Sequence, residues 1–521
     1  MTITTLHSLL LQLPKGKRYG VAMLLGALAA LAMAPFYLVF LLVPAFCGLL
    51  WLISGATGPR AAFTISWWFG VGYFSAGLYW IAGALLVDAA RYGWMVPFAI
   101  VGLSAGLAIF PGLVGLATNR LTAPFGGIAR VLVFAALWTG IEMLRGWVLT
   151  GFPWNLIGST WALSDAMIQG ASITGIYGLS LFTVTVATLP ATLVRERDRG
   201  GHIGPTVLAG VLLAGLWGIG LARLGAAPAL GQNTVPGVVL RLVQPNIAQQ
   251  DKWKPGLRVG NLKDQIAMSM APAPGPSPTH VIWSETAATY YLSADYPVRR
   301  AIAQAVPKGG LILTGAPRIT TAGEKPLKIW NSLYALDDRG DIVGTYDKSH
   351  LVPFGEYMPL RNITGLDKIV GKGTDFSPGP GVRTLRLPGL PPVSPLICYE
   401  VIFPGNVVDP EDRPEWMLNI TNDAWYGTST GPYQHFDAAR FRAVEQGLPL
   451  VRVANTGISG VIDSYGRVVK QLNLGQKGSL DSALPKALTA TVFSRYGNVL
   501  ALLLMVATGV LGMVMGRRRG S

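Results

Sequence analysis

Three places in the sequence end a strand-like run with a side chain that can take part in chemistry. In chain order they are Val281-Ile282-Trp283-Ser284-Glu285, Ile342–Tyr346 followed by Asp347-Lys348, and Ser394-Pro395-Leu396-Ile397-Cys398. Taken singly, each has a simpler explanation. A free cysteine is usually buried and inert, and an isolated Glu285 or Lys348 usually forms a surface ion pair.

Together, a carboxylate, an amine and a thiol match one chemical need. A cysteine thiol has a pKa of roughly 8.5 and is mostly protonated at neutral pH, whereas the thiolate is the nucleophile. A glutamate can accept the thiol proton, and a lysine can stabilise the oxyanion that forms when sulfur attacks a carbonyl group. The sequence therefore offers Glu285, Lys348 and Cys398 as a candidate catalytic set.

Metal chemistry is not indicated. The chain contains two cysteines and five histidines, and they form no Cys/His cluster. Cys47 lies in a very apolar run and is predicted to be a core residue. We expect neither a structural zinc site nor any other metal or cofactor.

The composition is that of a membrane protein. Of the 521 residues, 51% are hydrophobic and only 13% are charged, whereas soluble domains carry roughly 25% charged residues. The net charge of +15 does not indicate nucleic-acid binding, because the basic residues cluster beside apolar segments and form no stripe interleaved with aromatic residues. We interpret them as topology signals with some attraction for anionic phospholipid headgroups.

Eight apolar segments are long enough, alone or with their flanks, to cross a bilayer core that needs about 20 residues. They are Tyr19–Ala34, Phe36–Ser54, Ala61–Leu86, Gly93–Thr118, Ala129–Val148, Ala166–Val194, Pro205–Leu224 and Gly497–Met515. The first two are separated by Pro35 and could instead form a re-entrant hairpin. No cleavage site followed by a polar domain occurs, so we expect the first segment to be retained.

The distribution of arginine predicts the orientation. Most arginines of the connections and tail fall on the side of the N-terminus: Arg60, Arg120, Arg130, Arg195, Arg197, Arg199 and Arg517 to Arg519. The opposite side holds mainly Arg91 and Arg145. An even number of spans then places both termini in the cytoplasm and the long segment between the seventh and eighth spans outside.

Two polar features lie near the membrane. Glu142 and Arg145 are spaced i, i+3 on one helical face, and would either pair with each other or contact lipid headgroups. The loop Gly151–Asn155 is aromatic and turn-forming, and its Trp154 would be an interfacial anchor or a substrate contact.

The composition changes after the seventh span. Residues 1–227 are predicted to form a transmembrane domain of about seven helices, 235–490 an α/β domain, and 491–521 the final helix with a basic tail. Strands are expected at Val238–Val243, His280–Trp283, Leu311–Thr314, Ser332–Leu336, Ile342–Tyr346, Ser394–Ile397, Trp416–Ile420, Pro449–Val453 and Ser459–Asp463. Helices are expected near Tyr296–Val306 and Tyr433–Gln446, and Leu360–Asp375 would be a mobile lid or an ordinary surface loop.

These stretches resemble the nitrilase, or carbon–nitrogen hydrolase, superfamily, in which a Glu-Lys-Cys triad lies in an αββα sandwich. The resemblance is carried by Glu285, by Lys348-Ser-His-Leu-Val-Pro-Phe-Gly-Glu356 and by Cys398-Tyr399-Glu400. Further matching stretches are Leu242–Ile247 with Lys252-Trp253, Asn419–Trp425 and Asn455–Ser459. The eight spans, with the α/β domain before the last, are similar to the apolipoprotein N-acyltransferase family.

Two positions depart from that pattern. Pro245 stands where many members have glycine, and Ser284 stands where proline often precedes the catalytic glutamate. Both are neighbours of motif residues and replace no reactive group, so they concern loop geometry more than chemistry.

The resemblance implies a role for each motif residue. Cys398 would be the nucleophile, Glu285 the general base and Lys348 the oxyanion stabiliser. Supporting roles would fall to Glu356, which positions Lys348 or moves protons, and to Tyr399 and Glu400, which shape the pocket. Substrate contacts, with a packing role as the alternative, would fall to Trp253, Trp425 and Trp154.

The resemblance also implies the reaction and the partners. Cys398 would take the sn-1 acyl chain of a phospholipid, phosphatidylethanolamine in the first instance, as a thioester. The α-amine of the N-terminal diacylglyceryl-cysteine of an apolipoprotein would then receive it. The site would lie at the periplasmic face of a bacterial inner membrane. There Cys398 would have no disulfide partner in its own domain, as suits a reactive thiol.

Two other functions compete with this one. A membrane-tethered amidase would share the triad but pass the acyl group to water, and it would not need eight spans. A transporter or lipid-binding protein would not need an intact Glu285, Lys348 and Cys398, and would be expected to show repeated halves with broken helices.

Overall fold

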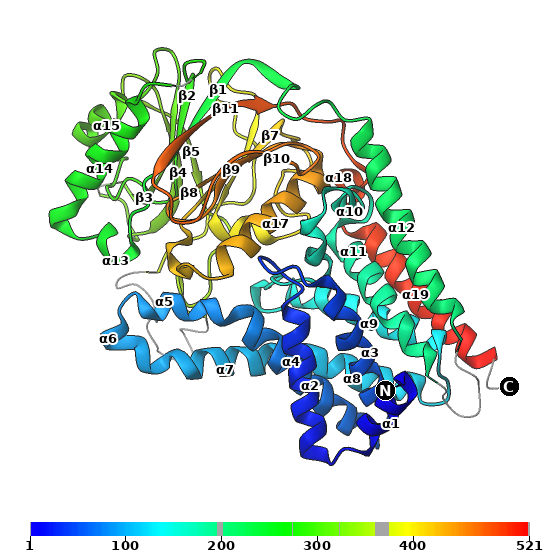
Figure 1. Ribbon diagram of the computed structural model, residues 1–521. Coiled ribbons are helices and arrows are strands. Elements are labelled where there is room, and N and C mark those ends of the chain that lie inside the picture. Colours follow the sequence, from blue (N-terminus) through cyan, green and yellow to red (C-terminus); the bar gives the residue numbers. More distant parts are fainter. Residues whose placement is uncertain (1, 195–201, 274, 322, 360–374, 519–521) are drawn as a thin grey trace. The chain divides into compact units, whose positions relative to one another are not determined.

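The chain forms two compact units. The first contains Met1–Ala82, Trp94–Ala227 and Ala490–Ser521, and the second contains Gly83–Gly93 and Pro228–Thr489. The computed structural model describes residues 2–194, 202–273, 275–321, 323–359 and 375–518 (Figure 1). The expected lid Leu360–Asp375, apart from its last residue, lies outside these ranges, as do Arg195, Arg197 and Arg199.

The first unit is built of helices. They are α1 (Ile3–Gln12), α2 (Lys15–Ala30), α3 (Leu42–Ser54), α4 (Pro59–Leu78), α7 (Val96–Leu107), α8 (Ile109–Thr122), α9 (Ile128–Arg145), α10 (Asp165–Ile168), α11 (Ala171–Thr188), α12 (Gly204–Gly225), α18 (Val492–Tyr496) and α19 (Val499–Arg518). Glycine lets α2 and α4 approach closely. A Cβ atom on Gly26 would lie 1.9 Å from the Phe69 carbonyl oxygen, and one on Gly72 would lie 1.9 Å from that of Met23.

Within the described residues, five segments are long and apolar enough to cross a membrane. They are Pro59–Leu86, Ala89–Thr122, Ala171–Leu193, Gly204–Gly225 and Val499–Arg518. The other three of the eight expected segments differ for simple reasons. The first is a helix of only 16 residues, α2, and the second is the shorter apolar helix Val39–Ser54. The third, α9, carries three charged residues, Arg130, Glu142 and Arg145.

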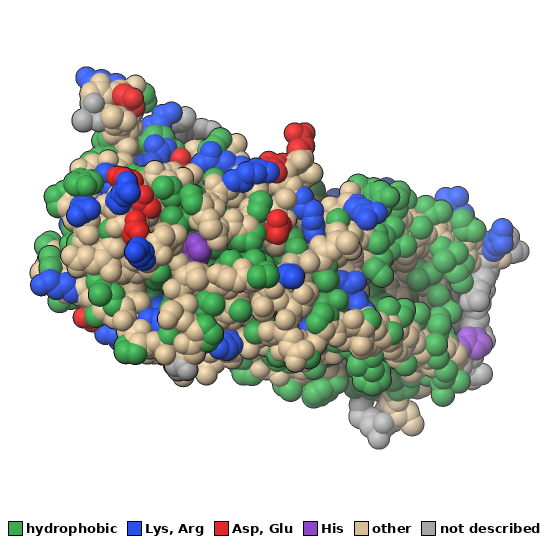
Figure 2. Space-filling view, turned by 90° about the horizontal axis from the view of Figure 1, so that it is seen from above, with side chains coloured by type: hydrophobic (Ala, Val, Ile, Leu, Met, Phe, Trp, Pro, Cys, Tyr) green, Lys and Arg blue, Asp and Glu red, His purple; other side chains and the backbone are tan. Residues whose placement is uncertain are grey.

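The helices α12 and α19 leave large apolar side chains exposed. Val211 and Ile219 of α12 are each 62% exposed, and Leu503 of α19 is 60% exposed. Figure 2 shows hydrophobic side chains gathered over the part of the molecule that contains these two helices. Such a surface is unfavourable in water and is typical of contact with lipid, so the protein is a membrane protein.

The second unit contains two β-sheets. Their strands are β1 (Thr234–Gln244), β2 (His280–Trp283), β3 (Ile312–Ile319), β4 (Ile329–Leu336), β5 (Ile342–Asp347), β6 (Val393–Ile397), β7 (Trp416–Thr421), β8 (Leu450–Ala454), β9 (Ser459–Ile462), β10 (Val468–Leu472) and β11 (Gly478–Pro485). One sheet has the order β11-β1-β2-β3-β4-β5 and the other β10-β9-β8-β7-β6. The strands β1, β2 and β3 are parallel, as are β6, β7 and β8.

The two sheets pack face to face over one apolar core. Leu242 and Leu333 of the first sheet share a buried cluster with Ile420 and Val453 of the second. The outer face of the first sheet is covered by α14 (Pro255–Met270) and α15 (Tyr296–Ala303), and α17 (Gly431–Gln446) packs on β8 (Figure 1). The order of layers is helix, sheet, sheet, helix, which confirms the αββα sandwich expected from the sequence.

All nine expected strands are present, but β10 and β11 were not predicted. Both are edge strands, at the ends of their sheets. No residue of β10, Val-Val-Lys-Gln-Leu, is fully buried, and β11 carries Gly, Ser and Asp beside its apolar residues. Strands that bury only part of one face lack the apolar run or strict alternation that identifies a strand from sequence.

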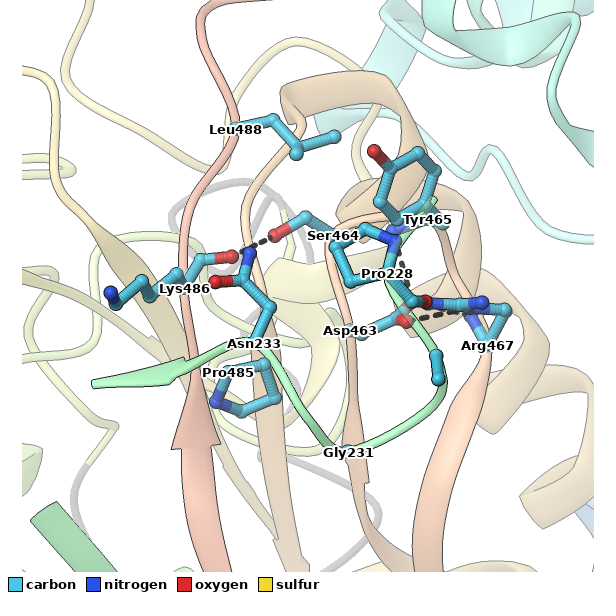
Figure 3. Close-up of a pocket in the computed structure, with 11 residues that line it drawn as sticks. Pro228, Gly231, Asn233, Asp463, Ser464, Tyr465, Arg467, Pro485, Lys486 and Leu488 are labelled. Carbon is cyan, nitrogen blue, oxygen red and sulfur yellow. Dashed lines mark hydrogen bonds and ion pairs between the residues drawn. The ribbon is translucent and has the colours of Figure 1, made fainter. Parts of the chain in front are cut away.

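A shallow hollow in the second unit lies where the segment before β1 meets the end of β11 (Figure 3). Arg467 donates a hydrogen bond to the Pro228 carbonyl at 2.9 Å and forms an ion pair with Asp463 at 2.7 Å. The Lys486 amide donates to the Asn233 carbonyl at 3.0 Å. These contacts tie the two ends of the domain together, so we interpret the hollow as a structural feature of the fold and not as a ligand site.

A buried ion pair fixes one edge of the first sheet. Arg241 of β1 is 2% exposed, forms a 2.7 Å ion pair with Asp481 of β11 and donates to the Ser269 and Ala271 carbonyls at the end of α14. Removing one partner of a buried pair costs about 3–5 kcal/mol, because the other charge stays buried. Arg241→Met should therefore lower the unfolding temperature of the full-length protein in detergent by several degrees.

A matched control is the Lys477–Asp264 pair, which has a similar distance of 2.8 Å but side chains 53% and 60% exposed. Exposed pairs contribute about 0–1 kcal/mol, so Lys477→Met should leave the unfolding temperature almost unchanged. Equal shifts for the two variants would contradict the assignment.

Candidate active site

Three strand ends bring the predicted reactive residues together. Glu285 follows β2, Lys348 follows β5 and Cys398 follows β6. The Lys348 Nζ atom lies 3.8 Å from Glu285 Oε1, and the charges of both residues act on the Cys398 thiol. All three side chains are buried, with exposed fractions of 6% for Glu285, 1% for Lys348 and 6% for Cys398. They therefore form one enclosed cluster.

Cys398 sits at a sharp turn. The chain passes from β6 directly into the short 3₁₀ helix η7 (Cys398–Ile402), and Cys398 has a φ angle of +53°. A residue with a side chain adopts this left-handed conformation only where its surroundings hold it.

Glu400 supplies much of that hold. One carboxylate oxygen accepts the Ile397 amide at 2.7 Å. The other accepts the Ser349 amide at 2.7 Å, the His350 amide at 3.1 Å and the Tyr346 hydroxyl at 2.9 Å. Glu400 thus fastens the turn that bears Cys398 to the segment that bears Lys348.

Lys348 is held by two carboxylates. Its ammonium forms a 2.8 Å ion pair with Glu356 Oε2 in addition to the longer contact with Glu285. Burial alone lowers the pKa of Lys348, but the charges of Glu356 and Glu285 outweigh burial and raise it above its ordinary value. The Val352 amide donates to the same Glu356 oxygen at 2.8 Å. Lys348 is therefore a fixed positive charge.

Asn331 was not identified from the sequence. Its Nδ2 atom donates to Glu285 Oε1 at 2.7 Å and to Glu356 Oε1 at 3.0 Å, so one amide bridges the two carboxylates. The backbone carbonyl of Asn331 accepts a hydrogen bond from the backbone amide of Lys348 at 2.8 Å. Only its place at the start of a strand-like run could have drawn attention to it.

Burial raises the pKa of the Cys398 thiol to about 12. This value already includes the negative charge of Glu285, which adds to the effect of burial, and the positive charge of Lys348, which partly offsets both. The resting thiol is therefore protonated at neutral pH. To act as a nucleophile it must give its proton to a base during the reaction.

A second buried lysine lies beside the cluster. Lys252, at the end of α13 (Gln249–Lys252), is 3% exposed and donates to the Glu285 backbone carbonyl at 2.9 Å. Burial lowers the pKa of Lys252 to about 8, although the charges of Glu285 and Cys398 act in the opposite direction. The sequence pattern drew attention to Lys252 only as the neighbour of Trp253.

The remaining candidate residues have different surroundings. Tyr399 is buried and packs edge-on against Phe403 at 5.1 Å. Trp253 is 48% exposed. The backbone of Trp425 lies close to Gly83, since a Cβ atom on Gly83 would be 2.7 Å from the Trp425 carbonyl oxygen. In the other unit, Trp154 is buried beside Trp80, with ring centroids 4.6 Å apart.

Glu142 and Arg145 both bind the loop that follows α9. Arg145 donates to the Phe152 carbonyl at 2.6 Å and to the Trp154 carbonyl at 2.8 Å. Glu142 accepts the Ile157 amide at 2.9 Å. Both side chains are buried, and their hydrogen bonds hold this loop. This role differs from the two expected from the sequence, which were mutual pairing and contact with lipid headgroups.

Within the described ranges, no group of three or more His, Cys, Asp or Glu side chains is arranged to hold a metal ion. The groups with chemical capacity are those of the buried cluster: a protonated thiol, two carboxylates bridged by an amide, and a fixed ammonium. This set can take a proton from sulfur and stabilise negative charge on a carbonyl oxygen.

Comparisons with known proteins agree with this chemistry. Residues 25–189 match the family model of the apolipoprotein N-acyltransferase N-terminal domain, and residues 242–492 match that of carbon–nitrogen hydrolase. An apolipoprotein N-acyltransferase from Rhodopseudomonas palustris is 42% identical over 97% of this chain and 96% of its own. One from Bradyrhizobium diazoefficiens is 43% identical over 95% and 94%. The chain therefore belongs to the apolipoprotein N-acyltransferase family, whose α/β unit is of the carbon–nitrogen hydrolase type.

Proposed function

We propose that the protein moves an acyl chain from a phospholipid to an apolipoprotein in two steps through a thioester on Cys398. Cys398 is the nucleophile, Glu285 the general base and Lys348 the oxyanion stabiliser. The observation that carries this assignment is the enclosed cluster itself. In this cluster the charges of the Glu285 carboxylate and the Lys348 ammonium both act on the protonated Cys398 thiol.

In the first step the Cys398 sulfur attacks the carbonyl carbon of the sn-1 ester while the thiol proton passes to Glu285. The negative charge that develops on the ester oxygen is stabilised by Lys348. The carbon–oxygen bond then breaks, Glu285 returns the proton to the leaving oxygen, and a lysophospholipid departs. The acyl chain remains on sulfur, and Glu285 is again a carboxylate.

In the second step the α-amine of the diacylglyceryl-cysteine attacks the thioester. A free α-amine has a pKa of about 7.7–8.0, so a substantial fraction is already neutral at neutral pH. Glu285 accepts a proton from the attacking nitrogen and returns it to sulfur as the carbon–sulfur bond breaks. The products are an N-acylated lipoprotein and the free thiol, which is the order of events in ping-pong catalysis.

The supporting residues follow from their contacts. Glu356 holds Lys348 and Asn331 holds Glu285, while Glu400 holds the turn that bears Cys398 and the buried Tyr399. Of the three tryptophans named as substrate contacts, Trp253 is the one whose exposure best suits contact with lipid or acceptor. Trp154 is only 4% exposed, which suits a packing role better than a substrate contact.

The donor is proposed to be phosphatidylethanolamine, and the α/β unit is proposed to face the periplasm of the bacterial inner membrane with both termini cytoplasmic. The arginine distribution supports this orientation. Both substrates are anchored in lipid, so a thiol at the outer surface of the bilayer would meet each of them.

One prediction concerns the thioester intermediate. Incubation with phosphatidylethanolamine should add one acyl mass to the peptide that carries Cys398, as read by mass spectrometry, and Cys398→Ala should abolish both the adduct and turnover. Cys47, buried in α3, provides an internal control and should stay unmodified. Turnover without an adduct on Cys398 would exclude the thioester mechanism.

The acceptor is tested in a separate assay. Adding a peptide with a diacylated N-terminal cysteine should discharge the acyl-enzyme and place the chain on the peptide amine. Release of free fatty acid alone would show transfer to water, and would favour the hydrolase over the transferase.

A further prediction concerns the pKa of Cys398. Glu285→Gln removes a negative charge that raises this pKa, so the pKa should fall and more thiolate should be present at each pH. In a Cys47→Ala background, alkylation by iodoacetamide between about pH 7 and 10 should then be faster than in the parent, while acyl transfer falls by about 10²-fold or more.

A suitable control is Glu324→Gln, since Glu324 is exposed. It should change neither rate. Slower alkylation in Glu285→Gln would mean that Glu285 already activates the resting thiol, contrary to the proton transfer described above.

A further inference from the structure

A fully buried polar network lies directly behind Cys398. Its members come from β7, β8, α17 and the segment after β7, and each is 0% exposed: Asn419, Asp423, His435 and Arg452. None of these side chains has a part in the two steps described above. Burying a charged carboxylate, a guanidinium and an imidazole is costly, so the arrangement calls for an explanation.

The network ends on the backbone of the nucleophile. His435 Nε2 lies 3.2 Å from the Cys398 carbonyl oxygen, and Asn419 Nδ2 lies 3.4 Å from the same atom. A carbonyl oxygen can only accept hydrogen bonds. The Nε2 atom of His435 must therefore carry a proton and donate it.

The other ring nitrogen faces a donor. His435 Nδ1 lies 2.9 Å from Arg452 Nη2, and a guanidinium can only donate. Asp423 Oδ1 also lies 2.9 Å from Nδ1 and accepts the Thr421 hydroxyl at 3.0 Å, while Arg452 donates to the other carboxylate oxygen, Oδ2, at 2.8 Å. A second proton on Nδ1 would make the ring an imidazolium whose Nδ1 lies 2.9 Å from the Arg452 guanidinium, so the ring is neutral, with its proton on Nε2 and with Nδ1 accepting from Arg452.

The charges around the ring agree with this protonation state. Burial lowers the pKa of His435, the positive charge of Arg452 lowers it further, and Asp423 only partly compensates. Burial raises the pKa of Asp423, but the adjacent Arg452 guanidinium, which is charged and donates to the carboxylate, holds the pKa below its ordinary value, so the carboxylate stays ionised. Arg452 and Asp423 thus neutralise each other and leave His435 uncharged.

We propose that His435 is a positioning residue for the nucleophile, with Asn419 as its partner and with Asp423 and Arg452 selecting its tautomer. By holding the Cys398 carbonyl from the buried side, the two donors keep Cys398 in its left-handed conformation, with φ of +53°. The sulfur is then held in the direction in which Glu285 and Lys348 act. This inference rests on the proposed role of Cys398 in acyl transfer.

The test compares two reactions of the same thiol in a Cys47→Ala background. Acylation by phospholipid needs an aligned sulfur, whereas alkylation by iodoacetamide needs only an accessible one. His435→Leu removes the donor and should slow single-turnover acylation at saturating phospholipid by about 10-fold to 100-fold. The KM for phospholipid and the alkylation rate should change by less than about threefold.

A conservative variant gives the rescue. His435→Gln can place an amide N–H toward the same carbonyl, and should restore acylation to within about fivefold of the parent. His280→Gln is the matched control, because His280 is a buried histidine of β2 that contacts Thr279. It should leave acylation unchanged. Equal acylation in His435→Leu and the parent, or parallel losses of acylation and alkylation, would overturn the proposal.

A measurement on the unsubstituted protein covers the case in which His435→Leu does not fold. With ¹⁵N-labelled histidine, the His435 ring should show a protonated Nε2 and an unprotonated Nδ1 at every pH from about 5.5 to 8.5. An imidazolium or a proton on Nδ1 in that range would overturn the proposal. Absence of any acyl adduct on Cys398 in the parent would overturn both this inference and the proposed function.

Discussion

The site depends on keeping one ammonium charged in a place that excludes water. Lys348 is 1% exposed, and a lone buried ammonium would lose its proton. Glu356 at 2.8 Å and Glu285 at 3.8 Å prevent this, and Asn331 keeps the two carboxylates from separating. Glu285 also acts on the Cys398 thiol through its negative charge. Together with burial, that charge places the pKa of the Cys398 thiol at about 12.

The three candidate catalytic residues are fixed in a similar way. Each has its backbone carbonyl held by a donor from elsewhere in the chain. Lys252 donates to Glu285, the Gly379 amide donates to Lys348, and His435 with Asn419 donates to Cys398. The strand ends bring the residues into one region, while these bonds set their directions. Groups misplaced by about 1 Å can lose 10²-fold in rate, so the second task matters as much as the first.

This division explains what could be predicted from the sequence. Strand runs that end in Glu285, Lys348 and Cys398 carry a local apolar signal, so the strands and the candidate residues at their ends could be predicted from the sequence, while the sandwich was expected from the family resemblance. Asn331 and His435 act through partners 46 and 37 residues away, and such pairings leave no periodicity in the sequence. The edge strands β10 and β11 were missed because they bury too little to show a pattern. Motif resemblance drew attention to Asp423 but could not give its partners.

A thiol with so high a pKa suits a site that must wait for two lipid substrates. The thiolate, rather than the thiol, reacts with oxidants and disulfides, so a protonated Cys398 is protected while the site is empty. On the proposed mechanism, the proton moves to Glu285 only as a carbonyl oxygen at Lys348 begins to take up negative charge. Proton transfer to Glu285 is then favourable only when the sulfur attacks the carbonyl carbon at the same time. Because Glu285 both raises the pKa of the thiol and receives its proton, one carboxylate accounts for the resting stability and the reactivity of the same sulfur.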